Sequence, residues 1–260
     1  MTTARDAATL LWRHWERSRR IDALPDACRP STRADGYAIQ TEVANVSRQA
    51  VAGWKIAATS LAGQKHINVD GPLAGRLLAG RELQPGTPVP LAGNLMRVAE
   101  AEFAFTMARP LPRRDKPYEM DDVMGAVDSL HPAIEVPDSR YVDFTRVGGP
   151  QLIADVACAC WFIIGPEAPS DWRDHDLAAH RVVAERNGEP VAHGGGANVL
   201  GDPRIALTWI ANELREFDRG LGAGDVVITG TCVPPVAVVP GDRVRMDFGA
   251  FGTIDAAFIE

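Results

Sequence analysis

Two glutamates stand two residues apart inside the apolar run RVAEAEFAF, at Glu100 and Glu102. Glutamate is uncommon in strands and is seldom buried without a partner, so this pair requires a physical explanation. On a strand, residues two apart share a face and lie ~7 Å apart at Cα. Repulsion between poorly solvated carboxylates raises their pKa unless a cation lies between them, and carboxylates favour Mg²⁺, Mn²⁺ or Ca²⁺.

A third acid, Glu135, lies in a second apolar stretch, AIEVPDSR. Three carboxylates, together with waters and a substrate oxygen, complete the octahedron that Mg²⁺ or Mn²⁺ requires. We therefore expect Glu100, Glu102 and Glu135 to form one metal site. Two other interpretations stay open: the Ala-rich segment could be a helix, which would point the glutamates apart, or the pair could lie on an exposed strand face.

Composition limits the classes of partner. The chain has 260 residues, a formal charge of −7, and four cysteines without a C-x-x-C pair. A nucleic-acid partner normally leaves a basic footprint, and a membrane span needs ~18 apolar residues in a row. The first twenty residues lack the continuous apolar core of a signal peptide. We therefore expect a cytoplasmic protein with free thiols and with neither nucleic acid nor membrane as a partner.

The elements that must position these acids fall into two parts. Residues 1–52 show helical patterning, with Asp35 as an expected N-cap, and residues 53–260 form a strand-rich body. A helix is expected from Pro203, capped by Asp202, and an apolar strand is expected to carry Cys158 and Cys160. The sequence thus predicts an α+β fold with a helical N-terminal subdomain and a mixed β body.

Six segments occur in one order with characteristic spacing: GWKIAATS, AEAEFAF, AIEVPDSR, LIADVACACWFIIG, HGGGANVLGDPRIALTWIANEL and LGAGDVVITGTCVPPVAVVPGDRVRMDFGAFGTI. Together they resemble the 2-keto-4-pentenoate hydratase family of the fumarylacetoacetate hydrolase superfamily, over residues 35–258. The resemblance implies the curled β-sheet of the superfamily's C-terminal domain. It also implies a homo-oligomer, a pentamer or a decamer.

Carried over residue by residue, the resemblance places the metal ligands at Glu100, Glu102 and Glu135. It implies catalytic roles for Lys55 and for Asp70, on the segment that follows, and a substrate-binding hydroxyl at Thr231. The flanking residues Trp54 and Ile56 already make a solvated lysine unusual at position 55, although strand alternation could point it outward. The chain departs from the family at Val156 and Cys158, which replace an Asn and a Ser, and in the residues after Thr231.

The function implied is a hydratase that uses Mg²⁺ or Mn²⁺ to add water to a small 2-hydroxy-dienoate, a 2-oxo acid in its enol form, in aromatic catabolism. The cation would stabilise the enolate and hold an anionic substrate in an acidic protein. Three alternatives stay open: a 4-oxalocrotonate-type decarboxylase, an acylpyruvate C–C hydrolase and a ligand-binding paralogue without activity.

Overall fold

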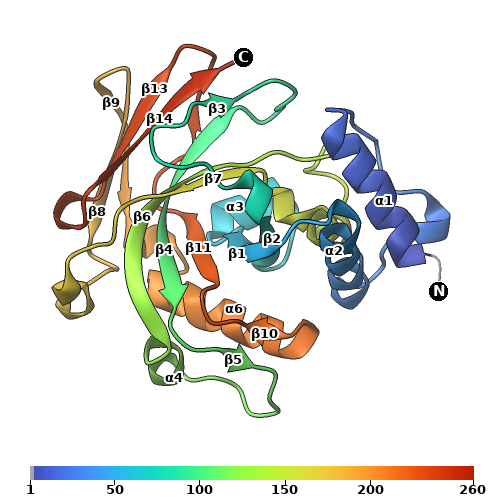
Figure 1. Ribbon diagram of the computed structural model, residues 1–260, viewed down its shortest axis with the longest axis horizontal. Helices are drawn as coiled ribbons and strands as arrows, with labels where there is room; N and C mark the ends of the chain where they lie inside the picture. Colours follow the sequence, from blue (N-terminus) through green and yellow to red (C-terminus); the bar gives the residue numbers. More distant parts are fainter. Residues whose placement is uncertain (1–2) are drawn as a thin grey trace.

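The computed structural model describes residues 3–260, so Met1 and Thr2 of the expected helical segment lie outside it. The fold is α+β, as the sequence predicted. Helices α1 and α2 lie at one end of the molecule, a curled mixed sheet occupies the middle, and a second sheet lies at the other end (Figure 1). In residues 3–260, no helix is long and apolar enough to cross a membrane.

The helices are α1 (Thr3–Glu16), α2 (Arg33–Ser47), α3 (Leu61–His66), α4 (Met120–Met124), α5 (Gly149–Ala154) and α6 (Pro203–Phe217). The strands are β1 (Val51–Ala57), β2 (Leu73–Leu78), β3 (Val89–Pro90), β4 (Val98–Met107), β5 (Leu111–Pro112), β6 (Val127–Val136), β7 (Trp161–Ile164), β8 (Arg181–Arg186), β9 (Glu189–Gly195), β10 (Gly220–Leu221), β11 (Val226–Thr231), β12 (Val236–Ala237), β13 (Arg243–Asp247) and β14 (Thr253–Ile259).

Capping side chains explain where the long helices begin. The α6 prediction is confirmed: Asp202 accepts a hydrogen bond from the backbone N–H of Arg204, and Pro203 occupies the first turn. The prediction of Asp35 as the α2 N-cap is wrong, because Thr32 holds that position. Asp35 is the third helical residue, and its carboxylate accepts from the backbone of Thr32 while the Thr32 hydroxyl accepts from Asp35.

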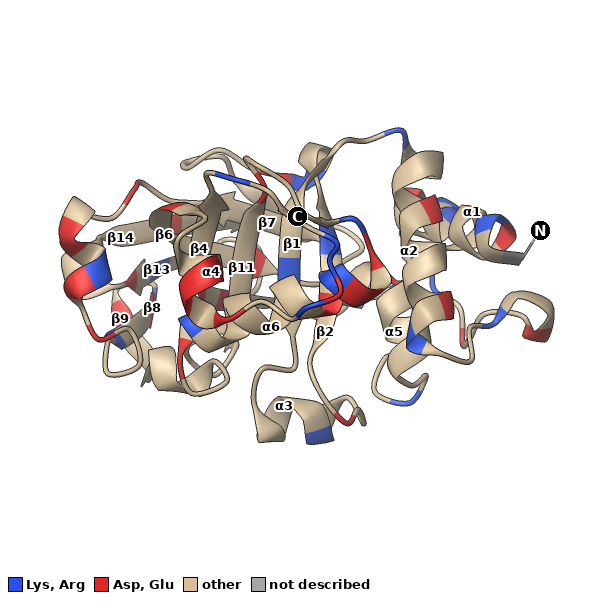
Figure 2. Cartoon of the chain, turned by 90° about the horizontal axis from the view of Figure 1, so that it is seen from below, with Lys and Arg blue, Asp and Glu red and all other residues tan. Residues whose placement is uncertain are grey.

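The central sheet has the strand order β2-β1-β11-β4-β6-β7, and β12 pairs with β4 as well. Strands β1 and β11 run parallel, whereas β4 is antiparallel to both β11 and β6. The second sheet has the order β3-β14-β13-β8-β9. Helix α3 projects from the body between β1 and β2, and the charged residues are dispersed over many elements (Figure 2).

The two faces of β4 have different surroundings. Ala99, Ala101, Phe103 and Phe105 are fully buried in the larger core, as strand alternation predicted. Phe103 meets Phe248 edge-on, with 5.2 Å between ring centroids, which ties the two sheets together. The opposite face carries Glu100, Glu102 and Ala104. Packing on one face of β4 therefore fixes the direction of both glutamates on the other.

A smaller core joins the N-terminal helices to the body. It contains Leu11 of α1 and Val43 of α2 together with Leu77, Ala154 and Phe162 from the strand-rich part. The change from helix to strand occurs at Val51, where β1 begins.

The expectation that an apolar strand carries Cys158 and Cys160 is wrong. Cys158 belongs to a turn at Val156–Cys158, and Cys160 comes directly before β7. Both cysteines are buried and free. The segment cannot extend into the sheet because its residues take up left-handed backbone angles, which are described below.

Candidate active site

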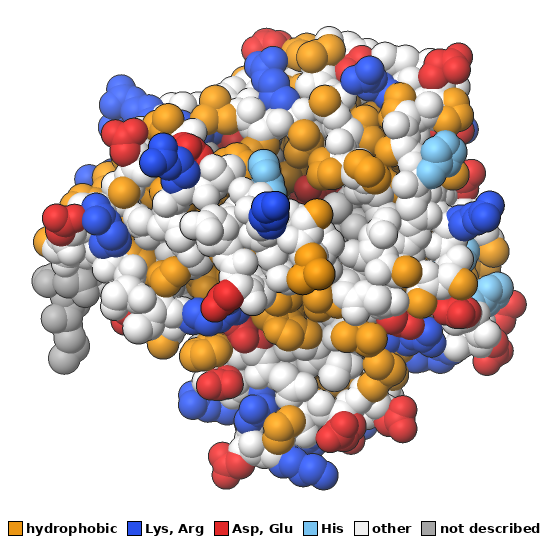
Figure 3. Space-filling model, turned by 180° about the vertical axis from the view of Figure 1, so that it is seen from behind, with side chains coloured by type: hydrophobic (Ala, Val, Ile, Leu, Met, Phe, Trp, Pro, Cys, Tyr) orange, Lys and Arg blue, Asp and Glu red, His pale blue; other side chains and the backbone are white. Residues whose placement is uncertain are grey.

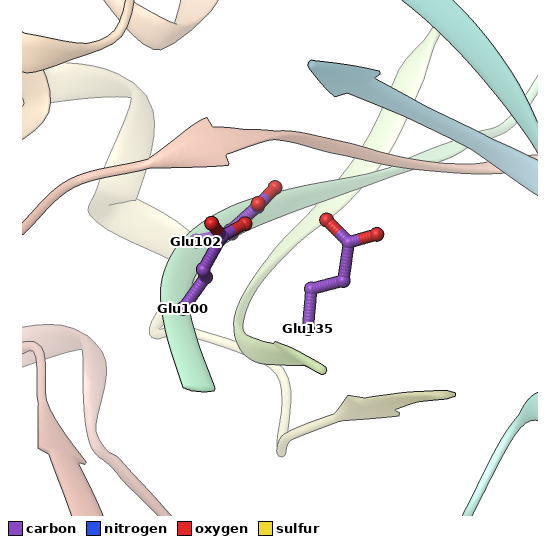
Figure 4. Close-up of side chains that lie close together, drawn as sticks. All are labelled: Glu100, Glu102 and Glu135. Atoms are coloured by element: carbon purple, nitrogen blue, oxygen red, sulfur yellow. The ribbon is translucent and has the colours of Figure 1, made fainter. Parts of the chain in front are cut away.

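Strand register brings the three acids together. Glu100 of β4 pairs directly with Glu135 of β6, and Glu102 lies two residues further along the same face of β4. One carboxylate oxygen from each residue can be chosen so that all three lie within 4.8 Å of one another. Figure 4 shows the Glu100 and Glu102 side chains rising from β4 beside that of Glu135. The helical alternative for this segment is therefore excluded.

The surroundings of these carboxylates suit a cation better than they suit three free charges. Burial, reinforced by the charge of Glu135, raises the pKa of Glu100 to about 7. Burial, with the charges of Glu135 and Glu100, raises the pKa of Glu102 well above its usual range. Burial raises the pKa of Glu135 as well, against the opposing charge of Lys55.

The donor set also has unused capacity. Glu102 Oε2 accepts a hydrogen bond of 2.6 Å from the backbone N–H of Gly230. The buried atoms Glu102 Oε1 and Glu135 Oε1 have no hydrogen-bond partner among residues 3–260. Orphaned carboxylate oxygens of this kind are costly unless a ligand satisfies them. The three residues therefore fit a hard divalent cation that prefers oxygen ligands.

Lys55 stands beside this cluster as its counter-charge. It lies on β1, is only 3% exposed, and pairs in register with Gly75 of β2. Its Nζ is 3.1 Å from Glu135 Oε2 and donates a 3.1 Å hydrogen bond to the carbonyl oxygen of Ala157. Burial opposes the charged form of this lysine, but the three carboxylates outweigh burial and raise its pKa. Lys55 is therefore a charged donor at neutral pH.

A left-handed turn presents that Ala157 carbonyl. Val156, Ala157 and Cys158 have φ angles of 47°, 50° and 64°. For residues other than glycine this conformation costs roughly 1–2 kcal/mol each, and strain of this kind collects at functional sites. The buried ion pair between Arg140 and Asp155 anchors the turn, and the Asp155 carboxylate also accepts from Ser139 Oγ at 2.8 Å.

A cavity of about 570 Å³ opens above this cluster. Lys55, Glu100, Cys158 and Thr231 form part of its wall, and most of the remaining wall is apolar. Figure 3 shows a hollow on this face, rimmed mainly by hydrophobic side chains, with an acidic side chain visible inside. Among the wall residues that the structure describes, Lys55 is the one lysine or arginine. The charged groups needed for an acid substrate thus lie at one end.

The residues that the resemblance implied separate into two groups. Thr231 lines the cavity, pairs with Glu102 in register, and donates its hydroxyl proton to the carbonyl of Val233 at 2.7 Å. Asp70 is exposed and does not belong to the cavity wall. Its catalytic role stays a prediction, and it would require the segment after α3 to move.

Sequence reasoning missed several wall residues. Thr59, His66 and Asn198 line the cavity, and Asn198 donates a 2.7 Å hydrogen bond to the carbonyl of Cys232. Thr59 and Asn198 lie in the GWKIAATS and HGGGAN segments, but no pattern singled out either residue or indicated that they meet. Of the two departures from the family pattern at the turn, Cys158 reaches the wall and Val156 does not.

Comparisons with known proteins agree with this fold and site. Residues 81–259 match the model of the fumarylacetoacetate (FAA) hydrolase C-terminal family. The chain is 34% identical to a 2-keto-4-pentenoate hydratase of Burkholderia vietnamiensis, covering 93% of this chain and 92% of the relative. It is 33% identical to a 4-oxalocrotonate decarboxylase of Pseudomonas putida, covering 88% and 86% of the two chains.

The chain belongs to the fumarylacetoacetate hydrolase family. Several of its curated relatives are 2-keto-4-pentenoate hydratases, as the six sequence segments predicted. Among solved structures, it resembles the 4-oxalocrotonate decarboxylase of Pseudomonas putida G7 complexed with magnesium and adipate. That match has a TM-score of 0.88 and 29% identity, covering 98% of this chain and 97% of the other.

Proposed function

We propose that the protein is a divalent-cation-dependent hydratase that acts on a 2-hydroxy-2,4-dienoate with a single carboxylate, in aromatic catabolism. The observation that carries the proposal is the cluster of Glu100, Glu102, Glu135 and Lys55 beside a cavity that Lys55 and Glu100 line. Among the described residues of the cavity wall there is no second lysine or arginine. Relatives with hydratase and decarboxylase names are about equally similar, so the support for a substrate with one carboxylate comes from the cavity wall.

Glu100, Glu102 and Glu135 would hold Mg²⁺ or Mn²⁺. When bound, the cation supplies a Lewis acid that polarises the 2-oxygen and offsets the substrate's negative charge. The magnesium in the solved decarboxylase and the orphaned oxygens of Glu102 and Glu135 both support this assignment.

Lys55 is suited to binding the substrate and to moving a proton. An ammonium has three donors; Lys55 donates one hydrogen bond to Ala157 and forms an ion pair with Glu135. A further donor is available to a substrate oxygen, because Lys55 forms part of the cavity wall. Thr231 is suited to contacting the substrate beside it.

The overall reaction balances as a hydration. The proton of the 2-hydroxyl group moves to C5, water oxygen adds to C4, and a proton is delivered to C3, giving a 4-hydroxy-2-oxo acid. Proton transfer by positioned side chains typically contributes ~10²–10⁴-fold in rate. Lys55 is the titratable group best placed for one of these transfers, and Asp70 is proposed for another only if its segment closes.

Decarboxylation of a diacid is the alternative that the test must exclude. A diacid would bring a second carboxylate into a wall whose other ionisable groups are His66, exposed at the rim, and the buried thiol of Cys158. Burial of a charge without a partner is unfavourable.

The test supplies metal-depleted protein with Mg²⁺ or Mn²⁺ and 2-hydroxypenta-2,4-dienoate. Loss of the dienol absorbance, with formation of the 4-hydroxy-2-oxo acid detected by mass spectrometry, would support the hydratase. Release of CO₂ from 2-hydroxyhexa-2,4-dienedioate that is faster than hydration of 2-hydroxypenta-2,4-dienoate would identify a decarboxylase instead. Binding of the dienoate without turnover would identify a ligand-binding paralogue.

A further inference from the structure

The cavity continues well beyond the charged end. Ala57 follows Lys55 by two residues on β1, so it faces the same side ~7 Å further along the strand. Ala57 pairs in register with Leu73, and both residues line the cavity. The part of the cavity beyond the end of β1 is therefore ~7 Å or more from Lys55, which is about the length of the carbon chain of a small 2-oxo acid.

Apolar side chains from separate segments enclose this far part. Leu73 and Leu152 are fully buried and line the cavity. Met96 and Phe144 are half-buried and line the cavity from the segments before β4 and after β6. Phe144 meets His66 of α3 edge-on, with 5.9 Å between ring centroids. Helix α3 and the segment after β6 thus contact each other at the cavity wall.

The cavity is larger than the smallest dienoate needs. A five-carbon 2-oxo acid has eight non-hydrogen atoms, which fill roughly 240 Å³ even at ~30 Å³ each, the share of one water molecule in the liquid. The cavity holds about 570 Å³. A five-carbon substrate would leave more than half of this mainly apolar cavity to water, which is unfavourable.

We propose that the preferred substrate carries an uncharged hydrocarbon substituent of at least two carbons on C5, and that Met96, Phe144 and Leu152 select it. This inference rests on the proposed function for the placement of the substrate's acid end at Lys55 and the three glutamates. It assigns the far end to side chains that offer apolar contact and no hydrogen-bond donor. Specificity then follows from hydrocarbon length and from exclusion of a second carboxylate.

The first experiment measures kcat/KM with Mg²⁺ for a series of 2-hydroxypenta-2,4-dienoates that carry hydrogen, methyl, propyl or carboxylate at C5. We expect kcat/KM to rise about fourfold for each added methylene, the transfer value for a buried CH₂ group. The carboxylate compound should be the poorest substrate. Equal or better use of the unsubstituted compound than of the propyl compound would overturn the inference, and so would preference for the carboxylate.

A charge placed in the far part of the cavity gives the second test. Phe144→Arg should reverse the preference, lowering kcat/KM for the propyl compound at least tenfold and raising it for the carboxylate compound. The matched control is Val142→Arg, which adds the same charge two residues away at a position that is 58% exposed and outside the wall. The control should leave kcat/KM for the propyl and the carboxylate compounds within about twofold of the wild-type values. Equal effects of the two variants would overturn the assignment of Phe144.

Binding separates this inference from the proposed function. Saturated 2-oxo acids have no carbon–carbon double bond to which water could add, so the rise in Tm that they cause with Mg²⁺ reports occupancy alone. If the rise in Tm increases with tail length but no dienoate is turned over, the specificity for a hydrocarbon tail would be kept and the hydratase proposal rejected. Turnover of the dienoates without any dependence on tail length would support the hydratase and reject the proposed specificity for a hydrocarbon tail. Failure of every 2-oxo acid to bind would overturn both.

Discussion

Replacement of Glu102 by Gln should stabilise the metal-free protein and remove its response to metal. The three acids and Lys55 carry a formal charge of −2 when all are ionised, and Glu102 is completely buried. Glutamine has nearly the same shape, and its carbonyl oxygen can still accept the hydrogen bond from Gly230 N–H. The substitution thus removes a charge and a metal ligand while the packing is kept.

The magnitude follows from the raised pKa values. A carboxyl group whose pKa rises from 4.5 to about 7, as for Glu100, is disfavoured in its charged form by roughly 3 kcal/mol at pH 8. The pKa of Glu102 is raised by the same cause, burial beside other acids. Relief of part of this penalty should raise the free energy of unfolding by about 1–3 kcal/mol, or roughly 2–10 °C in Tm for a chain of this size.

The pH dependence has a definite sign. Because the folded pKa of Glu100 exceeds its unfolded value, the folded protein retains a proton that the unfolded chain releases. The resulting stability is fully present below about pH 4.5 and is lost as the pH rises through about 7. Metal-free wild type should therefore become less stable between these values. Metal affinity should rise over the same range, because the ligands must lose their protons to bind.

The assay is thermal unfolding at pH 6 and pH 8, after chelation and again with Mg²⁺. At a concentration 100 times Kd, Mg²⁺ should stabilise the wild type by about 2.7 kcal/mol, whereas Glu102→Gln should gain far less. Glu167→Gln, at an exposed position, is the matched control and should follow wild type. A variant that is less stable than wild type without metal at pH 8, or that shows the full response to Mg²⁺, would refute the reasoning.

Three further predictions address the neighbouring groups and the assembly. Lys55→Met should lower kcat/KM ~10²–10⁴-fold, measured by loss of the dienol absorbance, yet bind Mg²⁺ at least as tightly because a competing cation is gone. Asp70→Asn should have a smaller effect than Lys55→Met in the same assay, because Asp70 is exposed and outside the cavity wall. Light scattering at micromolar concentration should show a pentamer or a decamer rather than a 28.0 kDa monomer.

The cluster of three carboxylates was predictable because it depends on two simple periodicities. Alternation along β4 places Glu100 and Glu102 on one face, and an antiparallel neighbour brings Glu135 opposite Glu100. The apolar neighbours of Lys55 drew attention to it but left an outward-pointing side chain open, and the family resemblance supplied its role. Its contact with Glu135 depends on a long-range arrangement of β1 and β6.

Other parts of the site carry no signal in the side-chain sequence. The groups that contact Lys55 and Glu102 include the Ala157 carbonyl and the Gly230 N–H, which are backbone atoms. Left-handed angles at Val156 and Ala157 contradict the ordinary preference of such residues, and tertiary packing overrides that preference. The predicted N-cap of α2 was three residues too late in the sequence, because Thr32 and Asp35 are both residue types that form a capping box.

The left-handed turn also determines which residue its neighbouring strand can tolerate. A Cβ atom at Gly75 would lie 2.1 Å from the carbonyl oxygen of Val156 and 3.0 Å from Ala157 Cβ. Even alanine at position 75 would have to push the turn outward, and with it the carbonyl that orients Lys55. In a mutational scan for activity, Gly75 should therefore behave as intolerantly as the acids themselves. Gly75 thus supports the proposed site through its missing side chain, although glycine is usually a weakening residue in a strand.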